Sequence, residues 1–153
     1  MLIETRPPTD PELTALVTAQ QRELRDRELA HGATDGSRPM GEDLRYLVVV
    51  VDGRAVACGA VQALDPQTAE LKRMYVRPAY RGRGIARQLL TALEQLALAE
   101  GHPVLRLETG EYPYSAIALY TAAGYAPIPT YGQYVGNPFS VCFEKRLPSR
   151  RQA

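Results

Sequence analysis

Residues 77–90 read RPAYRGRGIARQLL, and within them the chain changes from a predicted strand to a predicted helix. Before this stretch, Ala69 to Val76 has the composition of a strand. After it, apolar residues recur at helical spacing from Ile85 until Glu100-Gly101 ends the pattern. The first turn of a helix has backbone N–H groups without partners, and glycines let a ligand approach the backbone closely. The stretch therefore has the properties of a pyrophosphate-binding site.

Basic side chains gather around this stretch, although the whole chain is almost neutral. The chain has 18 basic and 17 acidic residues and a formal charge of +1. Residues 72–87 contain no acidic side chain but six basic ones, namely Lys72, Arg73, Arg77, Arg81, Arg83 and Arg87. The positive field is therefore local, and the overall balance gives no reason to expect nucleic acid or an anionic membrane as a partner.

Other interpretations of the glycine-arginine stretch have to be weighed. Two glycines before a helix can be only a turn. The Rossmann fingerprint fails because Arg87 occupies the third glycine position, and no GK[ST] follows for a P-loop. An arginine-glycine segment can bind RNA when it is disordered, but this one lies between a strand and an apolar-faced helix. A nucleic-acid-binding domain built on the arginines stays open as an alternative, and it predicts affinity that falls steeply with salt.

Length and composition predict one globular domain. The chain has 153 residues, of which 45% are apolar and 23% charged, and one core suffices for about 150 residues. We expect a single domain over residues 1–153, folded to about residue 147 with a tail from 148 to 153. The longest aliphatic run, Leu47 to Val51, is too short to span a bilayer, and the N-terminus lacks a signal-peptide core. A cytoplasmic protein without a membrane partner is expected, with Cys58 and Cys142 as buried thiols.

The order of predicted elements indicates an α/β (α+β) fold. A capping box over residues 9–12 predicts a helix that ends at Ala30, and the polar, glycine-containing residues 32–43 are expected to form a loop. Asp52-Gly53 predicts a tight hairpin turn, which makes the next strands an antiparallel meander. Strands are expected at residues 1–5, 44–51, 54–64, 69–76, 104–108 and 141–146, and further helices at residues 85–100 and 115–123.

Residues 81–86, RGRGIA, resemble the Q/R-x-x-G-x-G/A signature of the GNAT superfamily of acyl-CoA-dependent N-acetyltransferases. The similarity continues in AIALY at residues 116–120 and AGY at residues 123–125, which resemble the A-I-x-L-Y…G-F segment of that family. It covers roughly residues 44–147. The resemblance implies a single-domain GNAT-like fold with a mixed, mostly antiparallel central sheet, helices on both faces, and a splayed strand pair that forms the acetyl-CoA cleft.

The resemblance also implies acetyl-CoA as cosubstrate, and no metal. In the family, backbone N–H groups of the loop and the first helical turn hold the pyrophosphate, which corresponds here to Arg81, Gly82, Arg83, Gly84, Ile85 and Ala86. The pantetheine arm pairs with the preceding strand, which implies Met74, Tyr75 and Val76. An N–H of that strand would stabilise the oxyanion. Two positions depart from the family pattern: Pro113 replaces the usual Asn that contacts the pantetheine, and Ala86 replaces the last glycine.

Two catalytic residues are expected from the same resemblance. Glu70 stands eleven residues before Arg81, where several family members place a general base, because an amine of pKa about 10.4 must lose a proton before it attacks. The alternative for Glu70 is a solvated or salt-bridged strand residue, and Glu108 is the second candidate base. Tyr120 matches the family's acid, which protonates the departing thiolate. Its alternative is a core tyrosine on an apolar helix face.

These residues predict an N-acetyltransferase that transfers the acetyl group of acetyl-CoA to a primary amine by direct attack in a ternary complex. A small-molecule or amino-acid-like acceptor is preferred because no acidic run suits a polybasic protein tail. The alternatives are a non-enzymatic acyl-CoA-binding module and a protein or peptide N-acetyltransferase. Acyl-chain preference and a homodimer are left open. Four tyrosines either line the acceptor pocket or are exposed loop aromatics: Tyr112, Tyr114, Tyr131 and Tyr134.

Overall fold

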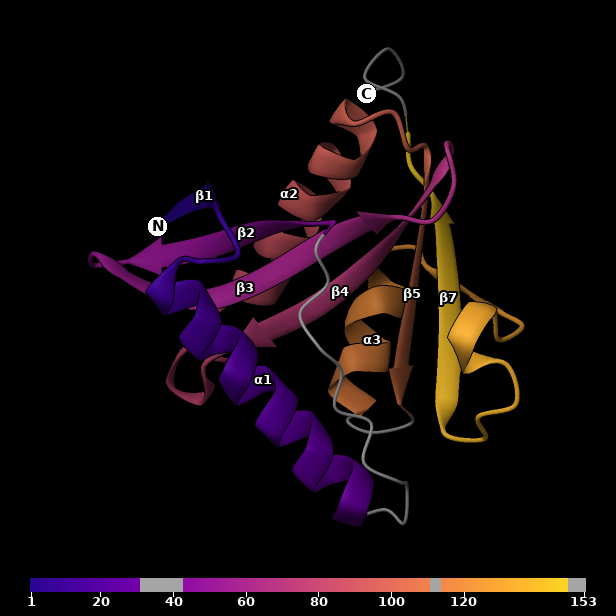
Figure 1. Cartoon of the computed structure of the whole chain (residues 1–153), viewed down its shortest axis with the longest axis horizontal. Coiled ribbons are helices and arrows are strands. Elements are labelled where there is room, and N and C mark those ends of the chain that lie inside the picture. The colour runs from indigo at the N-terminus through magenta and orange to yellow at the C-terminus, as the bar shows by residue number, and fades with distance from the viewer. Residues whose placement is uncertain (31–42, 111–113, 149–153) are drawn as a thin grey trace.

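A computed structural model describes residues 1–30, 43–110 and 114–148, and Figure 1 shows its arrangement. One seven-stranded sheet runs in the order β1-β2-β3-β4-β5-β7-β6. The strands are β1 (Leu2–Arg6), β2 (Leu44–Val51), β3 (Arg54–Ala63), β4 (Thr68–Val76), β5 (Val104–Gly110), β6 (Ala126–Ile128) and β7 (Ser140–Arg146). The helices are α1 (Pro11–Ala30), α2 (Ile85–Ala99) and α3 (Tyr114–Ala122), with short 3-10 turns η1 (Pro78–Tyr80) and η2 (Gly132–Tyr134).

The predicted fold class is confirmed. Neighbouring strands are antiparallel except for β4 and β5, which are parallel. The β2–β3 connection is the predicted tight turn, with φ of 51° at Asp52 and 78° at Gly53, as a type I′ turn requires. The short strand β6 and the two 3-10 turns were not predicted. Residues 32–42 of the expected loop lie outside the described residues, and only Asp43 of that loop is described. Residues 149–153 of the expected tail also lie outside them.

Helix α1 begins one residue later than the predicted capping box implies. The N–H of Leu13 donates to Asp10 Oδ2 at 2.9 Å, so Asp10 rather than Thr9 is the capping residue and Pro11 is the first helical residue. Glu12 does not close a box with Thr9. Asp10 caps α1 because its carboxylate is a good hydrogen-bond acceptor and also places a negative charge at the positive end of the helix.

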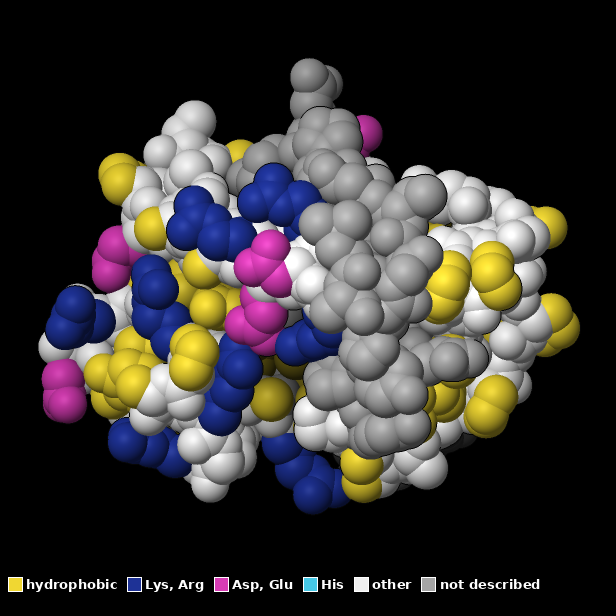
Figure 2. Space-filling view, turned by 90° about the horizontal axis from the view of Figure 1, so that it is seen from below, with side chains coloured by type: hydrophobic (Ala, Val, Ile, Leu, Met, Phe, Trp, Pro, Cys, Tyr) yellow, Lys and Arg dark blue, Asp and Glu magenta, His cyan; other side chains and the backbone are white. Residues whose placement is uncertain are grey.

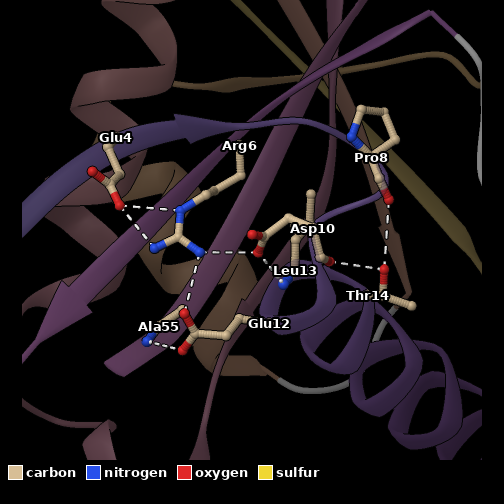
Figure 3. A network of polar contacts seen from close by, with 8 residues as sticks. All are labelled: Glu4, Arg6, Pro8, Asp10, Glu12, Leu13, Thr14 and Ala55. Atoms are coloured by element: carbon tan, nitrogen blue, oxygen red, sulfur yellow. Dashed lines mark hydrogen bonds and ion pairs between the residues drawn. The ribbon is translucent and has the colours of Figure 1, made fainter. Parts of the chain in front are cut away.

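The freed carboxylate of Glu12 joins a polar network that fixes α1 to the sheet (Figure 3). Glu12 accepts from the backbone N–H of Ala55 at 2.8 Å and from Arg6 at 3.2 Å. The Arg6 guanidinium also contacts Asp10 at 2.9 Å and Glu4 at 2.8 Å. The network therefore ties together the end of β1, the start of α1 and the start of β3.

The sheet is covered on both faces, as predicted. On one face, Leu13 and Leu16 of α1 pack with Tyr46, Val48 and Cys58 of the sheet. The other face carries the larger core, to which α2 and α3 contribute side chains. In Figure 1, α1 crosses in front of the strands while α2 lies behind β2 and β3. This arrangement leaves the end of the sheet around β5 and β7 clear of α1.

A β-bulge bends β4 in its second half. Cys58 pairs with Tyr75 but Ala60 pairs with Lys72, so β4 has one residue more than β3 over this interval. Arg73 lies within the bulge and has a φ of 63°, which is a strained backbone conformation for a residue other than glycine. Opposite the bulge, Gly59 is required: an added Cβ would come within 2.6 Å of Leu93 Cδ1 and 2.9 Å of Met74 Sδ.

The bulge coincides with the separation of β4 from β5. Pairing between the two strands extends only from Thr68–Val104 to Leu71–Leu107. Beyond these residues β4 continues to Val76 and β5 to Gly110 without pairing to one another. In Figure 1 the two strands start together and diverge toward their arrowheads. The predicted splayed strand pair is therefore present.

Candidate active site

The connection from β4 to α2 forms the first part of the site. Gly84 caps α2 with φ 78° and ψ 8°, and no side chain caps this helix. Gly82 also has a positive φ, of 77°. A Cβ added at Gly82 or Gly84 would meet no atom within 4 Å. The glycines thus serve the backbone conformation and leave open space beside the uncapped N–H groups of Ile85 and Ala86, which suits an anion.

The basic side chains of the connection have distinct positions. Arg81 folds back, since its Nε donates to the Val76 carbonyl at 2.8 Å and its Nη2 lies 2.8 Å from a carboxylate oxygen of Glu23 on α1. Arg83 lies over the Tyr80 ring. Arg73 is buried. It therefore adds nothing to an exposed basic surface, although it is one of the six basic residues counted in residues 72–87 of the sequence. Figure 2 shows lysine and arginine side chains on the face seen from below, with acidic side chains among them.

Met74, Tyr75 and Val76 form the last part of β4, after the bulge. They are partly buried, and Tyr75 and Val76 pair with β3 on one side. On the other side β5 has moved away, so the backbone of these residues borders the splay. An extended ligand chain could pair there as an added strand would.

Glu70 lies at the point where the splay begins, one residue before the last β4–β5 pair. It is the third residue of β4, and only 3% of it is exposed. Lys72 Nζ lies 3.2 Å from Glu70 Oε1, and the Tyr131 hydroxyl donates to Oε2 at 2.5 Å. The salt-bridged alternative thus describes its contacts correctly, and these contacts compensate for the burial of a carboxylate beside the cleft.

A second carboxylate follows on β5. Arg106 pairs with Glu70 across the ladder, and Glu108, two residues further, lies on the same face of the sheet. The Ser140 hydroxyl donates to Glu108 Oε2 at 2.6 Å. Glu108 therefore sits beyond the last β4–β5 pair, on the β5 side of the opening.

Tyr120 lies on the other face. It is 6% exposed and belongs to the α2–α3 core together with Leu71 and Leu107, whereas Glu70 alternates with Leu71 and points to the α1 side. Its ring meets Tyr125 edge to face, with centroids 5.8 Å apart. Burial raises the pKa of the Tyr120 hydroxyl, which therefore stays protonated at neutral pH. Glu70 and Tyr120 are thus not in contact; the splay lies between their two faces.

The tyrosines of the predicted acceptor pocket fall into two groups. Tyr131 is partly buried and Tyr134 is fully buried, and their rings meet edge to face at 5.4 Å. The reading of these two as exposed loop aromatics is therefore wrong, because they pack over the β5–β7 part of the sheet. Tyr112 and Pro113 lie outside the described residues, as does the side chain of Tyr114.

Sequence reasoning missed the partners of Glu70. Tyr131 is 61 positions away in the chain, and Arg106 had no assigned role. The Arg106 guanidinium lies 5.4 Å from the Tyr131 ring centroid and donates to Glu144 at 2.7 Å. Strand register alone would have placed Arg106 beside Glu70, but only after β4 and β5 were known to be parallel.

Both cysteines are buried free thiols, as predicted. Burial raises the pKa of Cys58 to about 12 and also raises that of Cys142, so neither is an activated nucleophile. Within the described ranges, no group of three or more metal-binding side chains is present. In the same part of the chain, no helix is both long and apolar enough to cross a membrane.

Comparisons with known proteins show the family and the fold. Residues 10–125 match the sequence profile of the acetyltransferase (GNAT) family. The IAA acetyltransferase of Azospirillum brasilense is 43% identical over 107 residues, which is 69% of each chain. A Klebsiella pneumoniae structure described as an acyl-CoA N-acyltransferase shares 35% identity with a TM-score of 0.82, covering 96% of this chain and 97% of that one.

A GNAT acetyltransferase of Elizabethkingia anophelis, solved with acetyl-CoA bound, is 17% identical with a TM-score of 0.71, over 95% of this chain and 97% of that one, and so shares the fold. Fold and site together define an acyl-CoA-dependent transferase. The chain belongs to the GNAT acetyltransferase family. It is accordingly an acetyl-CoA-dependent N-acetyltransferase.

Proposed function

We propose that this enzyme acetylates the primary amine of a small-molecule or amino-acid-like acceptor by direct attack in a ternary complex. The observation that carries the proposal is the buried carboxylate of Glu70 at the origin of the β4–β5 splay. On this proposal, the acceptor amine and the thioester meet where the sheet opens. We also propose that residues 1–147 act as one domain, since a single sheet runs through the described parts of the chain.

Coenzyme binding is assigned to the backbone of the β4–α2 connection and of the end of β4. Arg81, Gly82, Arg83, Gly84, Ile85 and Ala86 would surround the pyrophosphate, and Met74, Tyr75 and Val76 would pair with the pantetheine arm. The fit rests on the uncapped start of α2 and on the open space beside Gly82 and Gly84. Because the Arg81 side chain already pairs with Glu23, its contribution to the cradle is through its backbone.

In the proposed reaction, Glu70 accepts a proton from the acceptor ammonium, directly or through a water. The free amine then attacks the thioester carbonyl, and a β4 backbone N–H beyond the bulge stabilises the oxyanion. As the tetrahedral carbon collapses to the amide, the C–S bond breaks and Tyr120 donates its proton to the departing thiolate. The second proton of the attacking nitrogen passes through water to restore the Tyr120 hydroxyl, and Glu70 releases its proton to solvent. The raised pKa of Tyr120 means that the hydroxyl carries the proton required for this step throughout the neutral range.

The preference for a small acceptor is supported by one relative. The Azospirillum brasilense protein is named for IAA, a small molecule, and its similarity to this chain covers 69% of both. The described acidic groups around the opening are engaged: Glu70 pairs with Lys72 and Glu144 with Arg106, while Glu108 accepts a hydrogen bond from Ser140. This leaves little negative surface there for a polybasic peptide, which is the alternative acceptor.

The proposal is tested with an acceptor panel and thiol detection. Small primary amines, amino acids and lysine-containing peptides are assayed in parallel with acetyl-CoA, and we expect turnover with members of the first two groups. Turnover restricted to peptides would favour the protein-acceptor alternative. A dose-dependent rise of the melting temperature with acetyl-CoA, but no turnover with any acceptor, would favour the acyl-CoA-binding module. No response to acetyl-CoA at all would overturn the coenzyme assignment.

A further inference from the structure

A hydrogen bond between Tyr131 and Glu70 connects the end of the sheet to the proposed base. The Tyr131 hydroxyl lies 2.5 Å from Glu70 Oε2, which is at the short end for a bond to a carboxylate. Tyr131 immediately precedes the turn η2, whereas Glu70 lies within β4. The two residues meet only in the folded protein, so the contact is a product of the tertiary structure.

Tyr131 is itself held on two sides. Its ring lies edge to face against buried Tyr134, with centroids 5.4 Å apart. The Arg106 guanidinium lies 5.4 Å from the ring centroid, and Glu144 holds that guanidinium at 2.7 Å. The Tyr131 ring is therefore fixed by packing against Tyr134 and by the ion-paired Arg106, and its hydroxyl reaches Glu70 from this fixed position.

The proton of this hydrogen bond belongs to tyrosine. Desolvation raises the pKa of Tyr131, and the hydrogen bond to Glu70 raises it further. The phenol thus remains protonated, and remains the donor of this hydrogen bond, throughout the neutral range. Each carboxylate oxygen has two lone-pair positions, so Oε2 bonded to Tyr131 and Oε1 beside Lys72 can each still accept a proton from an amine or a water.

We propose that Tyr131 is a positioning residue for Glu70, which it holds in one orientation at the opening of the sheet. This inference rests on the proposed role of Glu70 as general base. A hydrogen bond to the charged form of a carboxylate favours that form, and a carboxylate without its donor is also free to rotate. Besides Tyr131, the ionisable groups around Glu70 are Lys72 on β4, Arg106 and Glu108 on β5, and Cys142 on β7.

The test compares three single variants, and the double variant of Glu70→Gln with Tyr131→Phe, over a pH series. Tyr131→Phe keeps the ring and removes only the hydroxyl. Tyr125→Phe is the matched control, because Tyr125 donates an equivalent bond to Glu94 at 2.8 Å on the opposite face of the sheet. Glu70→Gln removes the proposed base. For each variant, kcat/KM for the acceptor is measured from pH 5.5 to 9, together with the melting temperature and the Kd for acetyl-CoA.

We expect Tyr131→Phe to move the acidic limb of the kcat/KM profile upward by roughly one pH unit, the size expected for one lost bond to a charged group. Activity at the acidic end then falls about tenfold, while the Kd for acetyl-CoA is unchanged. Tyr125→Phe lowers the melting temperature without moving the limb. In the Glu70→Gln background, the added Tyr131→Phe substitution causes no further loss.

The outcomes separate the two claims. If Glu70→Gln keeps the wild-type profile, the base assignment is wrong and the inference about Tyr131 falls with it. If Glu70→Gln abolishes the acidic limb but Tyr131→Phe keeps the wild-type limb, the base assignment stands and Tyr131 is only structural. A limb that moves equally in Tyr131→Phe and Tyr125→Phe would also overturn the positioning role, because general destabilisation would then explain both.

Discussion

Substitution of Gly84 by alanine separates backbone strain from coenzyme binding, because the fold contains a matched glycine elsewhere. Gly84 at the start of α2 and Gly53 in the β2–β3 turn both have φ of 78°, and a Cβ at either position would meet no atom within 4 Å. The left-handed conformation costs a residue with a side chain about 1–2 kcal/mol. Both alanine variants should therefore lose about 2–8 °C in melting temperature, for a domain of this size.

Only Gly84→Ala places its methyl group beside the N–H groups proposed to hold the pyrophosphate. Loss of one charge-assisted hydrogen bond costs about 1.5–3 kcal/mol, and 1.4 kcal/mol corresponds to a factor of about ten in Kd. We therefore expect Gly84→Ala to weaken acetyl-CoA binding at least about tenfold, and Gly53→Ala to leave it unchanged. Isothermal titration calorimetry and thermal unfolding of the two variants give both quantities. Equal Kd values for the two variants would refute the proposed cradle.

Three further expectations follow from the described contacts. Tyr120→Phe should lower kcat by about a hundredfold without changing the Kd for acetyl-CoA, and wild-type turnover would remove the acid role. Gly59→Ala should lower the free energy of unfolding by about 1–3 kcal/mol through overpacking, and an unchanged urea midpoint would contradict it. The N–H of Leu13 lowers the pKa of Asp10 in the folded protein below its ordinary value of 3.8. The charged Asp10 carboxylate therefore stabilises the fold at pH values above its ordinary pKa. This stabilisation is lost as the pH falls through the lower pKa of the folded state. The gap in urea midpoint between wild type and Asp10→Asn should therefore close below pH 3.8, whereas a constant gap down to pH 2 would speak against this linkage.

Local patterns predicted the elements well, because their signals lie within each element. The Asp52-Gly53 turn and the helical spacing after Gly84 needed no distant partner, and both are present as predicted. The capping residue of α1 was misplaced by one position. Two acceptors, Thr9 and Asp10, stand next to each other there. The Glu12 carboxylate, which would close a box with Thr9, instead accepts from the backbone N–H of Ala55, which is distant in the sequence.

The site was predictable only as far as its motif extended. The glycine stretch and the family resemblance located the coenzyme loop and selected Glu70 and Tyr120, which the fold places on opposite faces of the splay. The bulge at Arg73 leaves no mark in the sequence, because a positive φ at an arginine is imposed by tertiary packing. The Tyr131 contact to Glu70 likewise required the register of β5 and β7, which no local pattern specifies.

The early end of the β4–β5 ladder gives the protein a sheet with a fissure in its middle. Beyond Leu71 and Leu107 each strand presents a row of peptide groups toward the other without joining it, although such unsatisfied rows normally occur at the rim of a sheet. On the proposed binding mode, the pantetheine arm completes the hydrogen-bond ladder from the β4 side during each catalytic cycle and leaves it incomplete again on release. Amide hydrogen exchange along the second half of β4 would then report directly on coenzyme occupancy, slowing with acetyl-CoA bound and recovering when the product departs.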